Sequence, residues 1–257
     1  MKGTNHISRV ASDFYFMDIV KMGWSGGKDS TCGAYKHLYR GDLLKAVCYI
    51  PHFTQDIPLI NKEHYEFIIR QADIFTQMGG QVFFAKGITY YDYCLSICKS
   101  GIHKGQVKGY PYINACGFRR DSKIKAVSSC DIGDFDYLDL AIAYDEKDRQ
   151  GQLNDKVRSI LVEEEITEEE AKRFCIEKNA YSPHYKYSKR DGCALCFNAK
   201  PIERQIWLND YPQAYDILLD LQNKLKSLLV GRKNEYPLRE YKHFIEIPPL
   251  LELLGVE

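Results

Sequence analysis

The sequence lacks a net charge, because its 35 lysine and arginine residues are balanced by 35 aspartate and glutamate residues. No global basic field would therefore draw the protein onto nucleic acid, although a local patch is compatible with this balance. The sequence also lacks an apolar run long enough to cross a bilayer. Its first residues, Met1–Asp13, are polar and lack the apolar centre of a signal peptide. We accordingly expect a cytoplasmic protein with no membrane partner.

Internal repeats and low-complexity segments are missing as well. What is present is a chain of 257 residues with 45% hydrophobic residues, which is enough for a sizeable core. The chain has nine cysteines. In a cytoplasmic protein these argue for free thiols and metal ligands rather than for a disulfide framework.

The most informative stretch lies between an apolar run and a segment of helical character: Ser25-Gly26-Gly27-Lys28-Asp29-Ser30. Small residues let a backbone approach a ligand closely, and a helix N-terminus directs its free N–H groups at an anion. Lys28 adds a mobile positive charge, and the two serines add hydroxyl donors. This combination suits a polyphosphate. The alternative is a chance Gly-Gly turn capped by serine.

The stretch does not have the spacing of a Walker loop. It resembles instead the PP-loop of N-type ATP pyrophosphatases, which cleave ATP between the α and β phosphates. The resemblance implies ATP and Mg²⁺ as ligands. It implies catalytic roles for Lys28 and Asp29, and nucleotide contacts along the whole loop, at Ser25, Gly26, Gly27, Lys28, Asp29 and Ser30.

Strands and helices alternate in the first half of the chain. We predict strands at Phe16–Trp24, Leu44–Ile50, Gln81–Lys86 and Leu138–Tyr144. Helices are predicted at Ser30–Arg40, Asn61–Met78 and Tyr91–Ser100, and Ser122–Val127 favours a short helix over a strand. This order predicts an α/β fold with a mostly parallel sheet, helices on both faces, and ligands at the C-terminal ends of the strands.

The second half is helical. A helix is predicted from Ile166 to about Asn179, with Thr167 as N-cap and Glu170 as its capping-box partner. A cysteine-bearing turn at Asp191–Phe197 precedes two further helices, at Pro201–Trp207 and Pro212–Leu229, and a tail from Tyr236 that packs on the surface. We assign residues 1–150 to a nucleotide-binding α/β core and residues 151–257 to a small helical part packed on it.

Two thiols in that turn, Cys193 and Cys196, have the C-x-x-C spacing that places both within reach of one ion. The spacing is compatible with zinc, with an iron–sulfur cluster or with a redox dithiol. The neighbouring cations Lys189 and Arg190 favour the thiolate over the thiol. A further candidate ligand is Cys116, which precedes Gly117 and two arginines.

Taken together, these motifs resemble the phosphoadenylyl-sulfate (PAPS) reductase family over residues 16 to about 222. The shared pieces are the PP-loop, Ala143-Tyr144-Asp145-Glu146-Lys147-Asp148-Arg149, the segment Leu161–Ala171, Tyr181-Ser182-Pro183-His184-Tyr185, and Arg190-Asp191-Gly192-Cys193. The resemblance implies an adenine nucleotide as ligand. It also implies that substrate, ribose or metal is held by Asp145, Glu146 and Arg149.

The chain departs from that family at its cysteines. Members with a four-iron cluster have adjacent cysteines where this chain has Ala115 and Cys116. Three ligands to a 4Fe–4S cluster, or alternatively to zinc, are then expected: Cys116, Cys193 and Cys196. Either Cys175 or Cys130 supplies a fourth, or one iron has no cysteine ligand; Cys175 is equally compatible with a buried core thiol. No cysteine follows Cys196, so the late nucleophilic cysteine of the reductases is missing.

We therefore expect an enzyme that adenylates an acceptor and then transfers sulfur to it, with a sulfur donor protein as a partner. The acceptor is a small molecule or a nucleic acid. One alternative is a PAPS or adenylyl-sulfate reductase in the narrow sense. The other belongs to a different class, a nucleotide-sensing or nucleic-acid-binding module without turnover.

Overall fold

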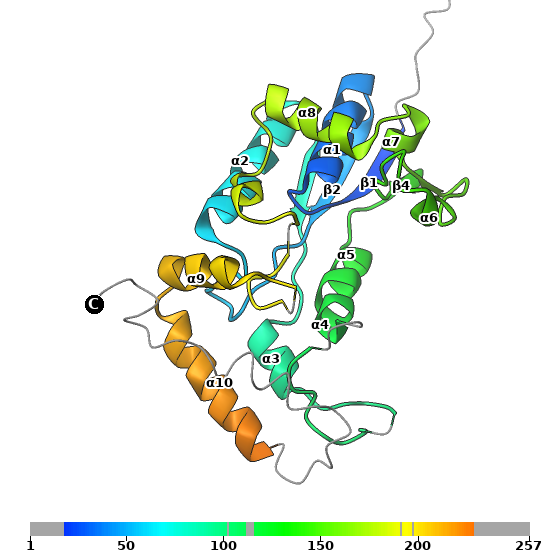
Figure 1. The fold of residues 1–257 in the computed structure, drawn as a ribbon. Coiled ribbons are helices and arrows are strands. Elements are labelled where there is room, and N and C mark those ends of the chain that lie inside the picture. Colours follow the sequence, from blue (N-terminus) through cyan, green and yellow to red (C-terminus); the bar gives the residue numbers. More distant parts are fainter. Residues whose placement is uncertain (1–17, 102, 112–115, 191, 197, 229–257) are drawn as a thin grey trace, which may run out of the picture.

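Five parallel strands form the centre of the computed structural model, which describes residues 18–101, 103–111, 116–190, 192–196 and 198–228. Their spatial order is β3-β2-β1-β4-β5. Figure 1 labels the three neighbouring strands β2, β1 and β4. The strands are β1 (Ile19–Trp24), β2 (Leu43–Cys48), β3 (Gln81–Phe84), β4 (Tyr137–Asp139) and β5 (Val157–Arg158). The predicted α/β fold with a parallel sheet is confirmed. The strand order reverses between β1 and β4, which is where such sheets bind ligands.

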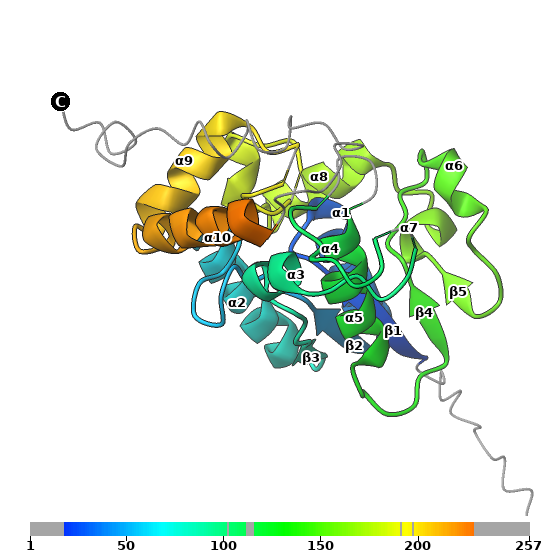
Figure 2. The same ribbon diagram turned by 90° about the horizontal axis from the view of Figure 1, so that it is seen from below.

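Two neighbouring residues of β1 show which helices cover each face, since successive strand residues point to opposite sides. A Cβ atom on Gly33 of helix α1 (Lys28–Arg40) would come within 2.8 Å of Met22 Cε. A Cβ atom on Gly23 would instead meet Val127 of helix α5 (Lys125–Ser129) at 3.8 Å. Helices α1 and α5 therefore lie on opposite faces of the sheet (Figure 2).

Helix α2 (Lys62–Gln77) packs beside α1 on the first face. Its Phe75 ring meets the edge of the Trp24 ring at a centroid distance of 5.1 Å. Tyr35 of α1 donates a hydrogen bond to Gln71 Oε1 at 3.0 Å. Trp24 is buried in this core, and α1 ends at Gly41, whose φ of 89° a residue with a side chain would rarely adopt.

The strand predicted over Leu138–Tyr144 is wrong in its length, because only β4 forms there. Asp139 turns its carboxylate back to accept the N–H of Ala141 at 2.6 Å, and Ala141 adopts a φ of 47°. The following apolar residues, Ile142 and Ala143, are buried without pairing as a strand. The prediction rested on an apolar run, and these residues are apolar because they are buried, although they do not pair in a strand.

The helix predicted over Tyr91–Ser100 is also shorter than expected. It is α3 (Tyr90–Leu95), after which Ser96 is extended and the chain forms a hairpin through an antiparallel bridge between Ile97 and Val107. The helix predicted over Ser122–Val127 is confirmed as part of a longer run. That run consists of α4 (Gly117–Arg119), a π-helical segment η1 (Arg120–Ile124) and α5.

The C-terminal helices pack on two clusters of buried apolar residues, one around α1 and α2 and one around α3. Helix α8 (Glu168–Glu177) has the predicted capping box between Thr167 and Glu170, and it lies against α1. Trp207 of α9 (Pro201–Asp210) is fully buried and donates from its indole to the Pro58 carbonyl at 2.7 Å. The remaining helices are α6 (Lys147–Gln150), α7 (Ile160–Glu163), a 3₁₀ turn (Pro183–Lys186) and α10 (Ala214–Leu228).

The tail from Tyr236 lies outside the described residues. Within the described ranges, no helix combines the length and the apolar character that a membrane crossing requires.

A buried charged network joins α1 to the sheet. His37 is inaccessible to solvent, and its ring nitrogens lie 2.7 Å from Asp42 Oδ2 and 3.0 Å from Asp139 Oδ2. Burial disfavours the charged imidazole, but the hydrogen bonds from Asp139 and Asp42 outweigh it and raise the pKa of His37. Asp139 also accepts the N–H of Ile160, so one carboxylate orients β4, α1 and α7.

We expect His37 to make stability depend on pH on the alkaline side. Because its folded pKa lies above the ordinary value of about 6.5, its contribution is complete below that pH and is lost as the pH rises through the folded pKa. The variant H37Q should lose about 3 kcal/mol of unfolding free energy and show a flatter decline above neutral pH. Urea denaturation across this range measures both quantities. A variant on the surface hairpin, H103Q, is the control and should retain the wild-type profile.

Candidate functional site

The Ser25–Ser30 stretch, predicted to be a PP-loop, lies at the turn between β1 and α1. Gly26 has a φ of 76°, and a Cβ atom there would come within 2.7 Å of Ile68 and 3.1 Å of the His64 ring. Glycine is thus required both by the backbone conformation and by the close packing of the loop on α2. Gly27 is the N-cap of α1 and offers no side chain to its first N–H groups, which suits an anion at this helix terminus.

The amine of Lys28 is held by two carboxylates. It lies 2.9 Å from both oxygens of Asp29 and 2.8 Å from Glu168 Oε2 on α8. Burial opposes its charge, but the hydrogen bonds to Glu168 and Asp29 prevail and raise the pKa of Lys28. Burial also raises the pKa of Asp29, against the effect of the lysine. Lys28 therefore stays protonated at the loop, but it is already paired.

The segment around Tyr185 contacts the loop, although it lies far from it in the sequence. The backbone N–H of Lys28 donates to the Tyr185 hydroxyl at 3.1 Å, and the ring of Tyr185 stacks on Tyr181 at 4.8 Å. In addition, the nearby Ser182 hydroxyl lies 2.7 Å from His64 Nδ1. Two motifs that are separated by about 150 positions thus meet at one place.

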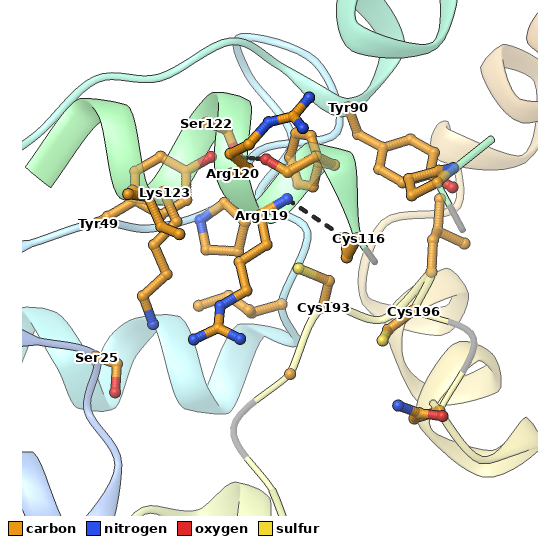
Figure 3. Close-up of a pocket in the computed structure, with 18 of the residues that line it drawn as sticks. Ser25, Tyr49, Tyr90, Cys116, Arg119, Arg120, Ser122, Lys123, Cys193 and Cys196 are labelled. Carbon is orange, nitrogen blue, oxygen red and sulfur yellow. Dashed lines mark hydrogen bonds between the residues drawn. The ribbon is translucent and has the colours of Figure 1, made fainter. Parts of the chain in front are cut away.

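A pocket of about 640 Å³ extends from this loop to the cysteines (Figure 3). Ser25 lines one end, and Cys116, Cys193 and Cys196 line the other. Apolar and aromatic side chains also line the pocket: Tyr49, Ile60, Ile68, Tyr90 and Phe118. Such a wall suits a flat heterocycle, and the charged ends suit groups of opposite charge.

The charged part of the wall is entirely cationic among the described lining residues: Arg119, Arg120, Lys123 and Arg190. Three of these belong to the run of α4 and η1. Arg119 and Lys123 point from this helix toward the loop of Ser25, whereas Arg120 points the opposite way (Figure 3). The π-helical turn at this point inserts an extra residue, a feature that is frequent at functional sites.

The three cysteines come from two segments. Cys193 and Cys196 close a tight turn in which the N–H of Cys196 donates to the Cys193 carbonyl at 3.0 Å. A hydrogen bond of 2.9 Å from the Ala194 N–H to the Leu59 carbonyl holds this turn against the chain after β2. The Sγ of Cys116 caps α4 by accepting the Arg119 N–H at 3.3 Å.

Burial favours the protonated form of two of these thiols, Cys193 and Cys116. It raises the pKa of Cys193 to about 12, and the other two thiols add to this, although Lys123 and Arg190 act in the opposite direction. Burial also raises the pKa of Cys116. Arg190 therefore favours the thiolate at Cys193, as expected from the sequence, but desolvation outweighs it.

Thiols are suitable ligands for zinc or for iron–sulfur clusters. As placed, however, no three histidine, cysteine, aspartate or glutamate side chains of the described residues are close enough to share a metal ion. To form a metal centre, the three thiols would have to move closer to one another. The 4Fe–4S cluster and its zinc alternative therefore stay predictions.

Cys175 is not brought to the other three thiols. It is buried on α8 in the core beside α1, and its thiol donates to the Lys28 carbonyl at 3.3 Å. This position matches the alternative that the sequence left open for it, a core thiol that supports the loop.

The predicted substrate segment after β4 lies beside the loop but does not line the pocket. Arg149 pairs with Glu146 at 2.6 Å, and Glu146 accepts the Ala143 N–H. Asp145 caps α8 by accepting the Glu168 N–H at 3.0 Å. Glu146 also raises the pKa of Asp29, which places it near the PP-loop. A role in holding ribose or metal stays a prediction for these residues.

Sequence reasoning missed several lining residues. Tyr49, His64 and Tyr90 face the pocket from three different elements, and no motif singled them out. Arg190 lines the pocket and also lies 3.7 Å from the buried carboxylate of Glu203. The sequence had already singled out Arg190 as a cation near the C-x-x-C turn and as part of the motif that ends at Cys193. A Cβ atom on Gly192 would clash with its guanidinium, so glycine leaves room for it.

No protein-family model matches the chain, and no curated protein matches its sequence significantly.

We expect protein prepared without oxygen to bind iron or zinc through Cys116, Cys193 and Cys196. The variant C193A should lose nearly all of it, because two thiols cannot replace a set of three. C175A is the matched control, a second buried cysteine that should keep its metal. Metal analysis and the visible spectrum measure the outcome: an iron–sulfur cluster is brown, and zinc is colourless. Full retention in C193A would contradict the site, and loss in C175A would restore Cys175 as a ligand.

Proposed function

We propose that the protein is a PP-loop enzyme that adenylates an acceptor with ATP and prepares it for sulfur transfer. The observation that supports this most directly is one pocket that is lined by Ser25 of the loop, by four cationic side chains and by three cysteines. A nucleotide site and a thiol site in one cavity allow activation and sulfur delivery at the same acceptor atom.

The triphosphate would lie between the loop and the helix run of α4 and η1. Arg119 and Lys123 reach from that helix toward Ser25, and charge-assisted hydrogen bonds from such groups to phosphate oxygens are strong. Mg²⁺ binds to one or two carboxylates together with phosphates, and the carboxylate of the loop itself is Asp29. The aromatic wall with Tyr49 and Tyr90 would receive the adenine.

Lys28 would act in the first chemical step. An oxygen of the acceptor attacks the α-phosphorus, the bond to the bridging oxygen breaks, and pyrophosphate leaves with its charge. Preorganised donors that face developing charge contribute most to such catalysis. Lys28 and the N–H groups of α1 would stabilise the departing pyrophosphate, once a nucleotide replaces Glu168 as the partner of the amine.

The second step exchanges oxygen for sulfur. Sulfur at the oxidation level of hydrosulfide, supplied by a sulfur donor protein, attacks the activated carbon of the acceptor. The carbon–oxygen bond breaks, and AMP leaves with the oxygen. The three cysteines would hold the metal centre, and such a centre would bind hydrosulfide and present it without a change in its oxidation state.

We expect K28A to lower pyrophosphate release by on the order of 100-fold, the typical cost of removing one donor to a developing anion. Lys36 provides a matched control, because it lies on the same helix and is also ion-paired, at 2.8 Å to Glu164. K36A should keep the wild-type rate. The assay measures AMP and pyrophosphate from ATP in the presence of candidate acceptors, and thermal melting confirms that both variants are folded.

Activity of K28A near that of the wild type would refute the PP-loop assignment. Nucleotide binding without turnover, under any acceptor tested, would favour the alternative of a nucleotide-sensing module.

We expect no efficient reduction of PAPS to sulfite with thioredoxin. That reaction requires a mobile thiolate that attacks the sulfonate sulfur and is then released by a second thiol. The sequence after Cys196 contains no cysteine, and burial raises the pKa of Cys175 beyond the range in which it would be a thiolate. Sulfite released over many turnovers, with PAPS, thioredoxin and its reductase supplied, would restore the reductase interpretation.

A further inference from the structure

The neutral balance of the whole chain conceals one strongly basic segment. Between residues 96 and 130 the sequence has a single acidic residue, Asp121, against seven cations: Lys99, Lys104, Lys108, Arg119, Arg120, Lys123 and Lys125. The opposite imbalance occurs at α8, whose first turn consists of Glu168, Glu169 and Glu170. These two segments thus carry charge of opposite sign.

Asp121 gathers three of these cations at one place. Its carboxylate lies 2.9 Å from Lys108 Nζ, 2.9 Å from Lys125 Nζ and 3.1 Å from Arg120 Nε. The cations hold the pKa of Asp121 well below its usual range, so the carboxylate remains charged. One negative charge cannot neutralise three positive ones, and this cluster keeps a net positive charge.

The cluster is accessible to a large ligand. The side chains of Arg120 and Lys125 are 69% and 68% exposed. The surface hairpin from Ile97 to Val107 ends next to Lys108 and carries two further exposed lysines, Lys99 and Lys104. We name Lys108, Arg120 and Lys125 together the cationic rim.

The rim and the pocket are built on the same helix. Arg119 and Lys123 point into the pocket toward the loop of Ser25, and Arg120 points the other way (Figure 3). Arg120 nevertheless also lines the pocket, so a polyanion on the rim would reach the pocket wall. The carboxylates of α8 would repel it from the other side of the loop.

We propose that the acceptor is a nucleic acid whose backbone phosphates bind the cationic rim while one unpaired nucleotide enters the pocket. This rests on the proposed adenylation and sulfur transfer. Clustered lysine and arginine side chains are the electrostatic signature of phosphate-backbone binding. A base inside a regular duplex cannot reach an enclosed site, so single-stranded RNA or DNA fits this geometry.

The test uses the full chain without nucleotide and a short fluorescent oligonucleotide of mixed sequence, as RNA, as DNA and as a duplex. Anisotropy is followed between about 50 mM and 200 mM salt. The double variant R120Q/K125Q removes two rim charges. The control K172Q/R173Q removes two cations from α8, which are also exposed and also paired with acidic residues of their own helix.

We expect single strands to bind with a strong salt dependence and duplex to bind more weakly. R120Q/K125Q should weaken binding by about tenfold and lower the slope of log K against log salt by about 1.4, which corresponds to two lost phosphate contacts. K172Q/R173Q should bind as the wild type does. A difference between the RNA and DNA arms identifies which of the two the rim receives.

The proposal is overturned if no oligonucleotide binds at the lowest salt, if the duplex binds as well as the single strand, or if the control loses as much affinity as the rim variant. K28A separates this proposal from the proposed function. If K28A leaves both turnover and oligonucleotide binding unchanged, the PP-loop chemistry fails while the rim stands. If K28A lowers turnover but R120Q/K125Q binds the oligonucleotide as the wild type does, the proposed function stands and the rim proposal fails.

Discussion

The close packing of Gly26 on α2 is the constraint on which the site depends. Because this residue has a positive φ and no side chain, the loop approaches His64 and Ile68 within ordinary contact distance. That approach fixes where β1 ends and where α1 begins, and it leaves Ser25 facing the pocket. On the other side, the Tyr185 hydroxyl accepts a hydrogen bond from the Lys28 N–H in the first turn of α1. A loop held on two sides in this way is preorganised for an anion, because few conformations remain to be lost on binding.

The second determinant is the separation of charge across the loop. Lys28 lies between the carboxylates of Asp29 and Glu168 and does not itself line the pocket, whereas Arg119 and Lys123 do. The ligand-free protein therefore keeps its loop lysine paired and its helix cations available. A bound polyphosphate would compete with Glu168 for the lysine, and the energy of that exchange would depend on how far solvent is excluded from the pocket.

Burial governs the chemistry at the other end of the pocket. Cys193 has two cations in its surroundings, yet the loss of solvent raises its pKa to about 12. A thiol in this state is a weak nucleophile, and only a ligand or a rearrangement that supplies positive charge at short range would convert it to the thiolate. Cys175, which sequence spacing could not separate from the other cysteines, lies in the core beside α1 and supports the Lys28 carbonyl instead.

The sequence by itself determined the features that rest on local interactions. The helices α1 and α2 and the capping box of Thr167 and Glu170 depend on residues within four positions of one another, so their pattern is visible in the chain. The glycines of the turn before α1 are visible too, but their packing on α2 is not.

Only the tertiary structure decided the length of β4, the joining of Tyr49, His64, Tyr90 and Arg190 in one pocket, and the exclusion of Cys175 from the thiol group. These features depend on contacts between distant segments and on the loss of solvent around them. The spacing of residues along the chain predicts neither these contacts nor this burial.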